Sequence, residues 1–246
     1  MKKDKLNLIA ILIVIVTILG GIYLSKSNGE NSQINTQEEN TSIKGGMSDE
    51  EINLELDNLL GILMNIHYIS ITDTTSSDPS TVILDELQEA MNDKNKLERL
   101  QYKLEPLMKS ENEVINVTAF ATETTRVILI QAYEKWIEYL HGFDITNPDI
   151  SEFQYQLALF GSSTHDAYLL FVEGASMLPV VAVEFKGEDG SENTINENIK
   201  NHFLSKIDEL FSDIFIENEK FYKETGNRYA IPLLVQGYKD FFNSPE

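Results

Sequence analysis

Few residues of this chain combine the types and the spacing that metal binding requires. Glu138 and His141 lie three positions apart on a predicted helix, as do the carboxylate–imidazole pairs of di-iron bundles. Such a centre needs a second pair and two further glutamates, and none of the other three histidines has an acidic residue three positions before it. We therefore predict no metal site, and we expect His141 to complement the dipole at the end of its helix.

A stretch with serine, histidine and aspartate side chains is the nearest approach to a hydrolase site. His165 and Asp166 follow Ser162, Ser163 and Thr164. A catalytic triad is defined by geometry rather than by adjacency in sequence, and the chain contains no G-x-S-x-G motif. It also contains no cysteine, which excludes a thiol nucleophile, thiolate metal ligands and disulfides. We expect a protein that is not an enzyme and has no catalytic residue and no cofactor.

Two charged residues are the candidates for ligand binding, Arg126 and Glu173. Thr118, Thr122 and Thr125 share a helical face beside Arg126, and we expect a solvated stripe there in preference to the lining of a ligand cavity. If Glu173 lies on a central helix, its carboxylate needs a partner. Arg126, on the preceding predicted helix, is the cation that we predict for it.

The surroundings of Glu173 leave the topology open. Residues 167–183 (AYLLFVEGASMLPVVAV) carry this one charge and could form a buried core helix, a second membrane span or partly a strand. A span would place the carboxylate in lipid at a cost of about 3 kcal/mol. We favour a long broken helix over residues 149–185 in the centre of the domain, because such a helix is apolar on all sides. The expected breaks are Gly161, Gly174 and Pro179.

Helical spacing of apolar residues over residues 48–246 predicts about six helices joined by short connections, which indicates an all-α, elongated antiparallel bundle. Capping boxes indicate three helix starts, at Ser48 with Glu51, Ser110 with Glu113, and Thr194 with Glu197. Cap-plus-proline pairs indicate two more, at Asp78–Pro79 and Asn147–Pro148. His67 and His202 lie on apolar helix faces, and we expect both to be hydrogen-bonded core histidines.

A single apolar run near the N-terminus predicts where the protein resides. Residues 6–24 (LNLIAILIVIVTILGGIYL) contain no charge and would span roughly 28 Å as a helix, close to the thickness of a bilayer core. No A-x-A pattern follows, so we favour an uncleaved anchor over a signal peptide, although small residues still permit cleavage. Lys2, Lys3 and Lys5 precede the run and predict a cytoplasmic N-terminus. Residues 1–24 would thus comprise this N-terminus and a single-pass anchor in the cell membrane, contacting the lipid bilayer through residues 6–24.

The rest of the chain is polar and acidic. Residues 25–47 have almost no apolar side chains and predict a disordered linker with an end-to-end distance of roughly 25 Å. Residues 48–246 would then form an extracytoplasmic domain. The formal net charge of −21 argues against a nucleic-acid partner, because phosphate binding needs a basic surface.

Two functions agree with this organisation. The first is a membrane-tethered helical bundle that acts in protein–protein interaction or assembly. The alternative is a bundle that binds or senses a small ligand and signals through a partner. Five residues before the span do not supply a cytoplasmic output domain, which favours the first function. A cavity lined by Arg126 and Glu173 would favour the second, and a large exposed apolar patch would favour the first.

Overall fold

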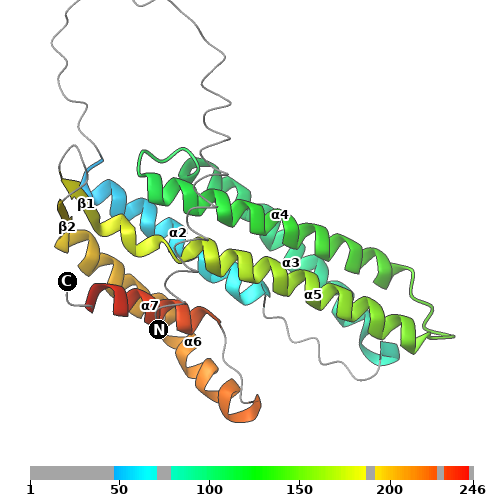
Figure 1. Ribbon diagram of the computed structural model, residues 1–246. Helices are drawn as coiled ribbons and strands as arrows, with labels where there is room; N and C mark the ends of the chain where they lie inside the picture. The colour runs from blue at the N-terminus through cyan, green and yellow to red at the C-terminus, as the bar shows by residue number, and fades with distance from the viewer. Residues whose placement is uncertain (1–46, 71–78, 187–191, 226–229, 244–246) are drawn as a thin grey trace, which may run out of the picture. The chain divides into compact units, whose positions relative to one another are not determined.

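Helices form in this chain where apolar residues recur three and four positions apart, as the computed structural model shows for residues 47–70, 79–186, 192–225 and 230–243 (Figure 1). The six α-helices of these ranges are α2 (Asp49–Ser70), α3 (Pro79–Leu107), α4 (Glu113–His141), α5 (Ile150–Ala175), α6 (Glu197–Thr225) and α7 (Ala230–Asn243). Between α5 and α6 lie the 3-10 helix η1 (Leu178–Ala182) and a hairpin of β1 (Val183–Lys186) and β2 (Glu192–Ile195). The prediction of a helical bundle is confirmed.

One of the three predicted capping boxes is present in the structure. The Glu51 carboxylate accepts from the Ser48 backbone N–H at 2.8 Å, and Ser48 Oγ accepts from the Glu51 N–H at 3.3 Å. The box predicted at Ser110 is wrong, because Asn112 caps α4 and its Oδ1 accepts from the N–H groups of Val114 and Ile115. Ser110 donates instead to Glu55 of α2. A contact between distant parts of the chain therefore decides which residue caps α4.

The start of α6 differs from the prediction in the same way. Thr194 lies in β2, paired with Glu184 of β1, so it does not cap the helix. Asn196 takes this role, and its Oδ1 accepts from the N–H groups of Asn198 and Ile199. The start of α5 is displaced more modestly, since Asp149 rather than Asn147 is the N-cap.

The core is organised around α2, which packs against α3, α4, α5 and α6. Its inward face is almost entirely aliphatic, so α2 is the helix that the others bury. The buried apolar residues of α2 are Leu56, Leu59, Leu60, Ile62, Leu63, Ile66 and Ile69. The sequence pattern placed the central helix at 149–185 instead, and that prediction is wrong.

Helix α5 is continuous and has one exposed face. It passes through Gly161 and Gly174 without a break and ends at Ala175, before η1 begins. Tyr155, Leu159 and Leu169 are exposed on its outer face. Because that outer face carries both polar and apolar side chains, the sequence pattern does not show that α5 is amphipathic. Of residues 167–183 only Val183 lies in a strand, at the start of β1, because η1 occupies Leu178–Ala182.

Helices α4 and α5 approach closely, and their contact explains one glycine. A Cβ atom added at Gly174 would lie 2.5 Å from the Ala121 Cβ, which is too close for any side chain. Towards the other end of the same helix pair, Trp136 stacks on Phe160 with ring centroids 5.4 Å apart and also contacts Phe153. Small residues at one end and aromatic residues at the other therefore hold the two helices together.

Helices do not all pack antiparallel to their neighbours. Along α2, Asp49 contacts Asn198 and Asp57 contacts His202, so α2 and α6 run in the same direction. The hairpin and η1 return the chain to the start of α2 before α6 begins. Helix α6 can therefore start beside the start of α2 and run parallel to it. The antiparallel arrangement expected from short connections holds for α3 with α4, where Lys94 meets Glu134 and Leu97 meets Arg126. Helix α4 also packs along α5, as Figure 1 shows.

Three tyrosine hydroxyl groups satisfy backbone groups at helix ends. Tyr168 accepts from the N–H of Ile231 in the first turn of α7, and Tyr238 donates to the carbonyl of Ala175 at the end of α5. Tyr133 donates to the carbonyl of Ile69 at the end of α2. Helix ends leave such groups without intrahelical partners, so these buried bonds compensate them where water is excluded. They also fix the position of α7 against α5.

The predicted anchor at residues 6–24 and the linker at 25–47, apart from Met47, lie outside the described residues. Within the part of the chain that the structure describes, no helix has the length and apolarity needed to cross a membrane. This covers residues 167–183, where α5 ends at Ala175.

Candidate functional site: the groove between α3 and α4

Arg126 is buried in the interior, but it does not meet Glu173. Its guanidinium donates to both carboxylate oxygens of Glu123, with Nε at 2.7 Å and Nη2 at 2.6 Å, and Nη1 donates to the Leu97 carbonyl of α3 at 3.3 Å. This bidentate arrangement uses the planar fork of arginine fully and neutralises its charge within one helical turn. Arg126 thus joins α4 to the backbone of α3.

Glu173 is exposed on the outer face of α5. The predicted pair of Glu173 with Arg126 is therefore wrong, and so is the prediction of a desolvated carboxylate in the bundle interior. The physical reason is the rotation of α5, which directs Phe171 and Ala175 inward and the position between them outward. A ligand-binding role for either residue stays a prediction, but the structure does not bring the two together.

The threonines beside Arg126 are buried, which contradicts the solvated stripe predicted for them. Thr118, Thr122 and Thr125 are almost fully excluded from solvent. The hydroxyl groups of Thr122 and Thr125 donate to the carbonyls of Thr118 and Ala121, one turn earlier in the same helix. A threonine bonded in this way presents mainly its methyl group to neighbouring helices. Its hydroxyl group already has a hydrogen-bond partner, so its burial costs little free energy.

The remaining sequence candidates lie on the surface. Ser162, His165 and Asp166 are all exposed on α5, and no hydrogen bond joins their side chains in the structure. Glu138 and His141 are exposed on α4. Among the residues that the structure describes, no group of three acidic or histidine side chains is arranged to hold a metal ion.

The two histidines expected in the core differ in their environments. His67 of α2 is fully buried, and its Nδ1 lies 2.9 Å from the Tyr168 hydroxyl. Burial lowers the pKa of His67 from 6.5 to about 4, so this imidazole is neutral at pH 7. His202 is half-buried between α2 and α6 and lies 2.8 Å from Asp57. The prediction of a hydrogen-bonded core histidine is confirmed for His67, and His202 sits at the edge of the core.

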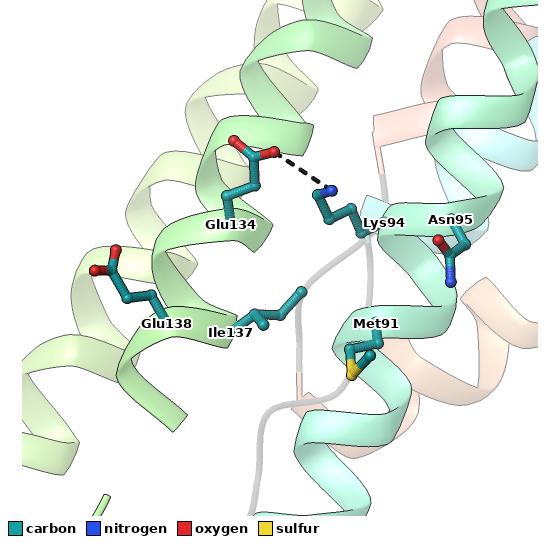
Figure 2. Close-up of a pocket in the computed structure, with 6 residues that line it drawn as sticks. All are labelled: Met91, Lys94, Asn95, Glu134, Ile137 and Glu138. Atoms are coloured by element: carbon teal, nitrogen blue, oxygen red, sulfur yellow. Dashed lines mark ion pairs between the residues drawn. The ribbon is translucent and has the colours of Figure 1, made fainter. Parts of the chain in front are cut away.

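A groove between α3 and α4 combines apolar and charged side chains (Figure 2). It has a volume of about 280 Å³ and is open to solvent. Met91 of α3 and Ile137 of α4 form its apolar part, with Ile137 pointing towards Met91. The polar residues around them are Lys94, Asn95, Glu134 and Glu138.

Charge around this groove is unequal. Lys94 Nζ lies 2.7 Å from Glu98 and 3.4 Å from Glu134, and Figure 2 shows the bond to Glu134 crossing between the helices. The hydrogen bond to Glu98, supported by Glu134, raises the pKa of Lys94. Glu138 lies one turn beyond Glu134, and no ion pair to it is found among the described residues. One lysine therefore faces three glutamates around an apolar surface.

The arrangement is suited to binding rather than to bond cleavage. Methylene groups can pack over Met91 and Ile137, and a cation can approach Glu138. Sequence reasoning missed this groove, although one signal was present. Glu134 and Glu138 are like charges at i and i+4, which destabilise a helix unless an opposite charge lies nearby. That spacing indicates that a cation is needed, and Lys94 supplies it for Glu134.

Comparisons with protein-family models, with curated proteins and with solved structures found no match for this chain.

Proposed function

We propose that residues 48–246 form a non-enzymatic, extracytoplasmic interaction module that binds another protein and docks it at the groove between α3 and α4. The observation that carries this proposal is the exposed side chain of Met91 beside the half-buried Ile137, with carboxylates around both on the surface of an acidic chain. Protein interfaces typically combine an apolar centre with a polar rim. The volume of about 280 Å³ is slightly below the range of pockets for drug-sized ligands, which favours a partner's side chains over a small molecule.

The second part of the proposal concerns location. Residues 6–24 would anchor the chain in the membrane, and residues 25–47 would tether the module outside the cytoplasm. Protease added to intact cells should then digest residues beyond 47 and spare the N-terminus. Complete protection of the domain would contradict this orientation, and recovery of a mature form that lacks residues 1–24 would contradict the uncleaved anchor.

Affinity capture of the full-length tagged chain from detergent-solubilised membranes tests the docking function. The wild-type protein is compared with Met91→Gln, which removes an apolar wall at nearly constant volume. Leu54→Gln is the matched control, because Leu54 is also exposed but lies far from the groove. Its neighbour Glu55 contacts Ser110, which follows the C-terminal end of α3. That end lies about 20 Å along α3 from Lys94.

The expected result is an identified protein that the wild type and Leu54→Gln retain and that Met91→Gln loses. Retention by all three variants would place the docking surface elsewhere. Failure of the wild type to retain any protein above the level of an untagged control would contradict the interaction function itself.

A further inference from the structure

We propose that the α3–α4 groove recognises a lysine or arginine side chain presented by the partner protein, an inference that rests on the proposed interaction function. The aliphatic stem of that side chain would pack over Met91 and Ile137, and its cationic head would reach the carboxylate of Glu138. Long basic side chains commonly combine these two kinds of contact, apolar along the stem and charged at the tip.

The argument for a cation begins with the charges already present. Lys94 is shared between Glu98 and Glu134. Its single positive charge cannot compensate both, and Glu138 stands one turn further along the open groove. A second cation entering beside Glu138 would reduce the net charge of these four side chains from −2 to −1. An acidic or phosphorylated partner would instead add negative charge to a site that already has an excess.

The apolar part of the groove argues for a side chain rather than a hydrated metal ion. Met91 and Ile137 offer no oxygen ligand, whereas hard cations such as Ca²⁺ need six or more oxygens. The same two residues give an alkyl stem a surface to cover. Complementary charge then selects a basic partner over an uncharged apolar one and accelerates its encounter with this chain, whose formal net charge is −21.

Binding of labelled peptides to the full-length chain in detergent micelles tests the inference without knowledge of the natural partner. The probes are an amphipathic peptide of lysine and leucine, its counterpart with glutamate for lysine, and an uncharged counterpart with glutamine. The basic peptide should bind more tightly than both. Fluorescence anisotropy at fixed ionic strength measures each affinity, because salt screens exposed charges.

Matched glutamate variants separate the groove from the general acidity of the chain. Glu138→Gln should weaken the basic peptide about threefold and the double variant Glu134→Gln, Glu138→Gln about tenfold, as expected for partly exposed ion pairs. Glu173→Gln makes the same charge change on another exposed helix face and should have little effect. Gly174, next to Glu173, faces Ala121 of α4. Ala121 precedes Ile137 by sixteen residues, so the Glu173 control lies about 24 Å from the groove along α4.

Equal weakening by Glu173→Gln and Glu138→Gln would show non-specific attraction and overturn the inference. Equal affinity for the uncharged or the acidic peptide would also overturn it. The proposed function fails separately. If capture of a partner depends on Met91 but not on Glu134 and Glu138, the docking groove stands and its preference for a cation is wrong.

Discussion

Protonation of His67 should make the domain measurably less stable in mild acid. The imidazole is fully buried, and burial lowers its pKa from 6.5 to about 4. Between these two values the unfolded chain binds a proton at this residue and the folded chain does not. Stability contributed by neutral His67 is therefore complete above about pH 6.5, decreases as the pH falls towards 4, and changes no further below that value.

The magnitude follows from the difference between the two pKa values. One pKa unit corresponds to about 1.4 kcal/mol, so the loss attributable to His67 is about 3 kcal/mol between pH 7 and pH 4. This is a large part of the stability of an ordinary domain. The Tyr168 hydroxyl, which accepts from the Ile231 N–H, can donate to His67 Nδ1 only while that nitrogen is unprotonated.

Urea unfolding of the fragment 48–246 and its His67→Leu variant at a series of pH values provides the assay. The carboxylates titrate in both proteins, so the difference between the two unfolding free energies isolates His67. At pH 7 the variant should be less stable, because it loses the hydrogen bond to Tyr168. As the pH falls towards 4, the difference between the two unfolding free energies should shrink. Its sign should reverse if the hydrogen bond to Tyr168 stabilises the wild type by less than burial of the protonated imidazole destabilises it. A difference that stays constant from pH 7 to pH 4 would refute the reasoning.

Three further predictions concern the folded domain. The fragment 48–246 should be soluble without detergent and mainly helical by circular dichroism; a requirement for detergent would contradict the topology. Gly174→Ala should destabilise it by about 1–3 kcal/mol in urea melts, because the added Cβ meets Ala121 at 2.5 Å, whereas Gly237→Ala has open space and should stabilise α7 by up to about 1 kcal/mol. Equal effects of the two alanines would show that α4 and α5 are not in close contact. Arg126→Ala should cost about 3 kcal/mol because it leaves Glu123 without its partner, and a loss below about 1 kcal/mol would indicate a solvated pair.

The difference between what could and could not be predicted is clear at the helix starts. Ser48 and Glu51 satisfy each other within one turn, and the sequence pattern located that cap correctly. Ser110 shows the same pattern, but Glu55 of another helix competes for its hydroxyl. Whether a capping pattern is used thus depends on a contact with a residue distant in sequence.

At the candidate site too, contacts between residues distant in sequence could not be predicted. The predicted partner of Arg126 was Glu173, but the carboxylate that pairs with Arg126 lies three residues earlier, at Glu123. The choice of Glu173 failed because it required the rotation of α5, which the sequence pattern left ambiguous. The sequence did not locate the groove, because Met91 and Ile137 come together only where α3 meets α4. The one sequence signal was the i, i+4 spacing of Glu134 and Glu138, which indicates a nearby cation but not an apolar surface.

The sequence by itself determined the features that depend on neighbouring residues: the helices from their apolar spacing, the acidic charge, and the absence of cysteine chemistry. Tertiary structure decided the central position of α2, its parallel packing against α6, the burial of the α4 threonines and the exposure of Glu173. The physical reason is that helix periodicity is local, whereas burial depends on which faces meet. Several pairings of amphipathic faces satisfy the same pattern, and close contacts such as Gly174 against Ala121 select one of them.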